Sequence, residues 1–134
     1  DSTAPEKIEV LSLDVDLNTY HVWEKLEVCQ ALVAIVEYNG FFPADSDWIA
    51  EYDPNGWWQG DFRMGAALKS MTLLAHQKGY RLVGCDLSGA NAFFVRHDLA
   101  EKHFPNENDP LGKFEPAQPF LLNNPEHRQI SQPL

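Results

Sequence analysis

Two apolar runs, separated by a short amphipathic stretch, dominate the first third of the chain. The runs span residues 8–15 and 31–36, and polar residues follow each of them. Apolar side chains at helical spacing lie between the runs, and Asn18 stands where a helix N-cap is expected. This pattern predicts a strand–helix–strand unit with parallel strands. The nearly continuous apolar content of both runs predicts strands that are covered on both faces.

The pattern changes farther along the chain. Apolar residues three to four positions apart over residues 62–78 predict the longest helix, with Asp61 capping its start and Gly79 ending it. Residues 80–85 and 91–96 are predicted to be two strands, and the short turn at 86–90 makes them antiparallel neighbours. We therefore expect an α/β fold whose mostly parallel sheet ends in an antiparallel hairpin.

A long stretch without periodicity, residues 39–61, interrupts this order. Loops of such length are often binding loops or lids. Its aromatic side chains could line a pocket, but for most of them we favour the interpretation that they hold the loop on the core. They are Phe41, Phe42, Trp48, Tyr52, Trp57 and Trp58.

The predicted organisation has three parts. Residues 1–6 form a flexible lead-in, residues 7–99 the α/β unit, and residues 100–134 a proline-rich extended arm that begins after a short helical turn. Because apolar residues interrupt the prolines, we expect this arm to lie on the domain or on a partner.

Charge excludes several partner classes. The 134 residues carry a formal charge of −10, which disfavours nucleic acids and anionic membrane surfaces. No apolar run is long enough to cross a bilayer, and the N-terminus lacks signal-peptide features. The absence of an initiator Met indicates either processing or a longer chain. Without CxxC spacing, Cys29 and Cys85 are interpreted as buried hydrophobes of a soluble protein in a reducing compartment, cytoplasmic or in an organellar matrix.

Acidic residues follow the two strands of the first unit. Asp14 and Asp16 end the first apolar run, and Glu37 ends the second. In an open α/β sheet, ligands bind beyond the carboxyl ends of the strands, so these carboxylates are the candidate catalytic residues. One of them with a raised pKa could act as a general base, and Asp14 and Asp16 are the candidates for a divalent cation.

Four neighbouring side chains are the candidates for substrate binding: Tyr20, His21, Tyr38 and Asn39. His21 is also a candidate base, although a solvated or capping histidine explains it more simply.

Several segments resemble one enzyme family. LSLDVDLNTYHVWEKL is similar to the "SIDIDGNDYxxW" segment of FkbM-like, S-adenosylmethionine-dependent methyltransferases, and the stretch from YDPNGWW to FFVRHDL is similar to that family's ending. The resemblance covers about Ile8 to Leu99 and implies the C-terminal half of a Rossmann-like domain. Leu17 and Thr19 depart from the motif, where the family has Gly and Asp.

The resemblance places the adenosylmethionine site mainly in the half that would precede Ile8, with its glycine-rich turn. The chain as given therefore has no cofactor site, and adenosylmethionine would bind only if an upstream half exists. We expect a non-catalytic structural or interaction subunit, completed by a protein partner or by that N-terminal half. The alternative is the C-terminal part of an active methyltransferase that acts on a small-molecule or glycan hydroxyl or amine. An enzyme of another class ranks last, because no hydrolase, metalloprotease or P-loop motif occurs.

Overall fold

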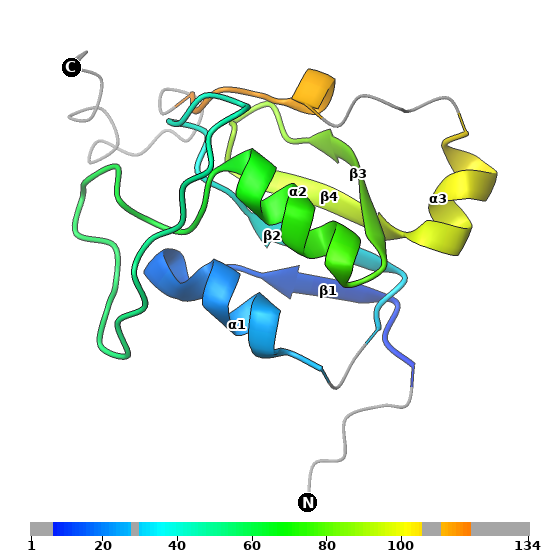
Figure 1. The fold of residues 1–134 in the computed structure, drawn as a ribbon, viewed down its shortest axis with the longest axis horizontal. Coiled ribbons are helices and arrows are strands. Elements are labelled where there is room, and N and C mark those ends of the chain that lie inside the picture. The colour runs from blue at the N-terminus through cyan, green and yellow to red at the C-terminus, as the bar shows by residue number, and fades with distance from the viewer. Residues whose placement is uncertain (1–6, 28–29, 106–110, 119–134) are drawn as a thin grey trace, which may run out of the picture.

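A four-stranded sheet with two helices on one face forms the body of the protein (Figure 1). The structure, a computed structural model, describes residues 7–27, 30–105 and 111–118. The elements in chain order are β1 (Val10–Leu13), the 3-10 turn η1 (Asp16–Asn18), α1 (Thr19–Lys25), β2 (Val33–Glu37), α2 (Leu68–Gln77), β3 (Tyr80–Cys85), β4 (Asn91–Arg96), α3 (His97–His103) and the 3-10 turn η2 (Leu111–Lys113). This confirms the α/β class and the predicted order of strands and helices. Within these ranges, no helix is long and apolar enough to cross a membrane.

The strand order is β1-β2-β4-β3, and only the β1–β2 pair is parallel among the described strands. The expected strand–helix–strand unit and the β3–β4 hairpin are both present. Strands β1, β2 and β3 run in the same direction, but β4 lies between β2 and β3 and is antiparallel to both, so the sheet is mixed and the hairpin does not simply extend its edge. The segment containing α2 carries the chain from β2 past one strand position to β3, and the hairpin then returns β4 into the gap.

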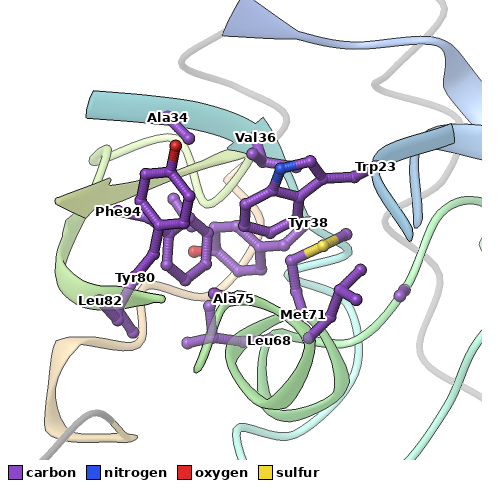
Figure 2. Close-up of a cluster of buried hydrophobic side chains, with 13 residues drawn as sticks. Trp23, Ala34, Val36, Tyr38, Leu68, Met71, Ala75, Tyr80, Leu82 and Phe94 are labelled. Carbon is purple, nitrogen blue, oxygen red and sulfur yellow. The ribbon is translucent and has the colours of Figure 1, made fainter. Parts of the chain in front are cut away.

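The core lies between the sheet and helices α1 and α2 (Figure 2). Trp23 of α1 is buried, and its ring centroid lies 5.2 Å from that of Phe94 in β4 and 6.1 Å from that of Tyr80 in β3. Leu68 and Met71 of α2 complete the same cluster. Burial of such large side chains is the main source of stability in a domain of this size.

The second face of the sheet is less well covered. Ala34 and Val36 of β2 are buried, whereas Val33 and Ile35, which alternate with them, are only half-buried. In β1, Val10 is 54% exposed. The prediction that both strands are covered on both faces is therefore wrong for the described chain.

Helix α3 covers only part of this second face. It contacts β3 and β4, where the Arg81 guanidinium donates hydrogen bonds to the carbonyl oxygens of Ala100 and Phe104. On β1 and β2 the same face leaves Val10 exposed and Val33 and Ile35 half-buried.

Helix α2 begins at Leu68, six residues later than the predicted start at residue 62. Gly65 has a φ of +58°, and the backbone around it pairs with the long loop instead, through Ala50 N–H to the Gly65 carbonyl (2.8 Å) and Ala67 N–H to the Trp48 carbonyl (2.9 Å). Asp61 does not cap the helix; its carboxylate accepts hydrogen bonds from Arg63. Gly79 ends the helix as predicted, with a φ of +84°.

Part of the C-terminal arm is fastened across the end of the sheet. Residues 115–118 form a strap: the Ala117 N–H donates to the Gly40 carbonyl (2.9 Å) and the Gln118 N–H to the Ser88 carbonyl (2.8 Å). The Tyr38 hydroxyl donates to the carbonyl of Glu115. Residues 115–118 of the predicted arm therefore lie on the domain, whereas residues 119–134 lie outside the described residues.

Gly89 allows the strap to approach closely. Its φ is +72°, and a Cβ there would collide with the carbonyl of Pro116 and lie 2.6 Å from the nitrogen of Ala117. Gly79 also has a positive φ, but a Cβ there would meet no atom within 4 Å.

We predict that Gly89→Ala lowers the free energy of unfolding by about 2–4 kcal/mol, and Gly79→Ala by about 1 kcal/mol, because only the first adds a collision to the backbone cost. Urea titration measures both losses, and amide exchange at Ala117 and Gln118 reports the strap. Equal losses, with unchanged exchange in Gly89→Ala, would show that the strap does not depend on this glycine.

Candidate functional site

Two of the three predicted carboxylates meet where the parallel strands end. Asp14 directly follows β1, and Glu37 is the last residue of β2. Because Leu13 pairs with Val36 in register, the next residues of both strands lie at the same edge of the sheet. The two carboxyl groups are close enough that the negative charge of Asp14 raises the pKa of Glu37.

Thr19, at the start of α1, bridges this pair to the backbone. Its side chain is buried, and its Oγ1 lies 3.1 Å from Oε2 of Glu37 and 3.2 Å from the carbonyl oxygen of Asp16. Oγ1 also accepts a hydrogen bond from the Val15 N–H (3.0 Å). With one proton, the hydroxyl donates to only one of the two oxygens at a time. In the sequence, Thr19 was notable only as a departure from the family motif. Its contact with Glu37 could not be predicted, because that contact depends on the fold.

Burial makes Glu37 an unusual acid. Its pKa is raised from 4.5 to about 8, first by burial and then by the negative charge of Asp14, and the hydrogen bond from Thr19 only partly offsets these effects. At neutral pH, Glu37 is therefore mainly protonated. A buried carboxyl group that keeps its proton near neutral pH can exchange that proton with a bound group, as a general acid or base does.

Asp16 is less closely involved than the other two carboxylates. Its backbone has a φ of +51°, in the left-handed region that side chains rarely adopt, and its charge is the smallest of the contributions to the Glu37 pKa. Across the described residues, no three His, Cys, Asp or Glu side chains are arranged to hold a metal ion.

His21 and Tyr20 lie on α1; His21 contacts the long loop, whereas Tyr20 packs partly against the core. His21 Nε2 donates to the Ala50 carbonyl (2.7 Å), so this nitrogen carries a proton. The His21 ring makes edge contacts, with centroids 5.6 Å apart, with both Tyr20 and Tyr52. Burial and the charge of Glu24 raise the pKa of Tyr20. His21 thus fastens the loop to α1 in this structure.

Tyr38 and Asn39 are both buried and bonded to backbone groups. The Tyr38 hydroxyl binds the strap, and burial raises the pKa of that hydroxyl. Nδ2 of Asn39 donates to the carbonyls of Phe62 (2.6 Å) and Met64 (2.9 Å), and its Oδ1 accepts from the Phe41 N–H (3.1 Å). These contacts organise the loop after β2, and a substrate-binding role for the two residues stays a prediction.

The loop aromatics fall into two groups. Phe41 packs on Phe62, with centroids 4.8 Å apart, and Phe42 stacks on Trp48 at 4.4 Å. These contacts hold the loop in place through Phe41, Phe42 and Trp48, which are three of the six loop aromatics. Two others are exposed: Tyr52 by 60% and Trp57 by 70%.

We predict that Glu37→Gln removes a pH dependence of stability. Because the pKa of Glu37 is raised on folding, the stabilisation it gives is complete below about pH 4.5 and is lost as the pH rises to about 8. Between these limits the wild type should lose about 3–5 kcal/mol of unfolding free energy relative to Glu37→Gln. Denaturant titrations across this range measure the difference.

Glu9→Gln is the matched control, because Glu9 is an exposed carboxylate just before β1. It should leave the pH dependence of the wild type unchanged. If Glu37→Gln also leaves it unchanged, the Glu37 carboxyl titrates normally and the raised pKa is refuted.

Comparison of the chain with protein-family models, with curated proteins and with solved structures found no match.

Proposed function

We propose that this chain is a methyltransferase-like half domain that serves as a structural or interaction module and completes its sheet along β1 with further polypeptide. That polypeptide is a protein partner or an N-terminal half of the same domain. The free edge of β1 carries the proposal.

The two outer strands of the sheet differ in what lies beside them. The turn η2 lies beside β3, the outer strand at the far end of the sheet. Strand β1 pairs with β2 on one side and with no described strand on the other. Unpaired edges invite pairing with another chain, and proteins usually protect them with charge, proline or a covering segment. The described part of β1, Val-Leu-Ser-Leu, has no such protection.

Backbone alternation identifies the groups that point to the free side. The Glu9 carbonyl accepts a hydrogen bond from the Val33 N–H (3.0 Å), and Leu11 is in register with Ala34. In a parallel ladder, the backbone groups of alternate residues bond to the same neighbouring strand. The backbone N–H and C=O groups of Leu11 and Leu13 therefore point to β2, while those of Val10 and Ser12 point to the free side.

The second face of the sheet adds an apolar surface next to this edge. Val10 is exposed, and Val33, Ile35 and Phe93 are half-buried on the same face. A partner that added a strand beside β1 and packed against this face would bury both the free backbone groups and these side chains.

The alternative, part of an active methyltransferase, is favoured by the Asp14–Glu37 pair. This pair lies at the strand ends where a sheet of this kind binds ligands, and Glu37 holds a proton at neutral pH. In that case the pair would take the proton from a small-molecule or glycan hydroxyl or amine, while the upstream half held the adenosylmethionine. The glycine-rich turn that the family resemblance implies for cofactor binding does not occur in this sequence.

We predict that the isolated chain associates through β1. Ser12→Pro removes an outward N–H on an edge strand, where proline is tolerated, and should shift the chain to monomer in sedimentation velocity. Ser12→Ala keeps the N–H and should associate like the wild type. A wild type that stays monomeric at all concentrations, or a Ser12→Pro variant that associates equally, would contradict pairing at this edge.

Calorimetric titration with S-adenosylmethionine separates the two functions. The isolated chain should show no saturable binding at micromolar concentration, because the glycine-rich turn that the family resemblance implies for the cofactor does not occur in this sequence. Saturable binding would reject the non-catalytic module and favour the enzyme.

A further inference from the structure

A groove formed by the long loop is separate from the carboxylate pair and from the β1 edge. It has a volume of about 800 Å³ and lies between η1 and residues 48–63 of the loop, which Figure 1 shows extending beyond the ends of α1 and α2. Its size is within the range of small-molecule sites. We propose that this groove binds an organic ammonium cation.

Contacts with η1 and α1 fix the walls of the groove. Asn18 binds the loop twice: Nδ2 donates to the Asp53 carbonyl (2.7 Å), and Oδ1 accepts from the Asp53 N–H (3.2 Å). His21 donates a hydrogen bond to the Ala50 carbonyl. Leu17 packs so closely against Gly56 that a Cβ on Gly56 would collide with it. These contacts hold the loop open against the first helix, which lowers the cost of ordering it around a ligand.

The two most exposed aromatic side chains of the loop both line this groove. Tyr52 and Trp57 are 60% and 70% exposed, whereas Phe42 and Trp48 are stacked on each other. Exposed aromatic rings attract a cation placed over their faces, and quaternary and alkylated ammonium groups lose little hydration in doing so.

The charge of the groove favours the same kind of ligand. Glu51, Asp53 and Asp61 line it, and Arg63 is held by Asp61 in an ion pair of 3.0 Å. Within the described chain, Glu51 and Asp53 have no ion-pair partner. The net charge of the lining is therefore negative, as is that of the whole protein, so anions are repelled and cations attracted.

An organic cation fits this lining better than a metal ion does. No three acidic, histidine or cysteine side chains among the described residues are placed to coordinate a metal. An alkylammonium group, in contrast, can contact the rings of Tyr52 and Trp57 while its charge faces Glu51 or Asp53.

Choline and its neutral carbon isostere, in which a tert-butyl group replaces the trimethylammonium group, test the proposal directly. The indole signal of Trp57 is followed by NMR while the intact chain is titrated with each compound. We expect choline to bind at least about fivefold more tightly than the isostere, and to weaken as salt is added. Equal binding of the two compounds, or saturation by neither, would overturn the proposal.

Three variants locate the site. Trp57→Ala and Glu51→Gln, at exposed positions, should each weaken choline binding at least about threefold without unfolding the chain. Leu87→Ala removes another exposed apolar side chain, from the β3–β4 turn outside the groove, and should bind choline like the wild type. An equal loss in Leu87→Ala, or no loss in Trp57→Ala, would place the cation elsewhere. Because none of these residues belongs to β1 or to the Asp14–Glu37 pair, the outcome is independent of the proposed function.

Discussion

The parallel pairing of β1 with β2 is the constraint from which the rest of the structure follows. It requires a crossover, and α1 in that crossover places Trp23 over the sheet, where the core forms. It also brings the carboxyl ends of the two strands to one edge, which is why Asp14 and Glu37 meet. The same pairing leaves the other side of β1 without a described neighbour. Core, carboxylate pair and free edge are therefore consequences of one strand pair.

Helix α1 links the core to the long loop. On one side it buries Trp23, and on another its His21 binds the loop at Ala50. Asn18, just before the helix, binds the loop at Asp53 with both ends of its amide. Thr19, its first residue, contacts Glu37. A change that displaced α1 would thus disturb the core, the carboxylate pair and the groove together.

The sequence predicted what is local and periodic. The strand–helix–strand unit, the hairpin and the end of α2 at Gly79 follow from apolar periodicity and turn residues, and the meeting of Asp14 and Glu37 follows from parallel strands. The start of α2 could not be predicted in this way. Met64 fits the helical spacing, but residues 65–67 pair with the loop far back in the chain.

The cover of the sheet was not predictable either. Val33 and Ile35 are as apolar as Ala34 and Val36, so composition could not show that one face of β2 is packed and the other half-buried. The position of β4 between β2 and β3 was likewise not predictable. Either strand of the hairpin could have paired with β2, and the local sequence does not decide between them. The roles of Thr19 and His21 depend on contacts with Glu37 and Ala50, which only the fold brings near.

The central claim is that the sheet is incomplete along β1, and amide hydrogen exchange at single residues in the dilute monomer tests it most directly. The outward N–H groups of Val10 and Ser12 should exchange rapidly, while those of Leu11 and Leu13, which face β2, should be protected. Protection of Ser12 equal to that of Leu11 would show that the chain covers this edge itself, and would contradict the claim.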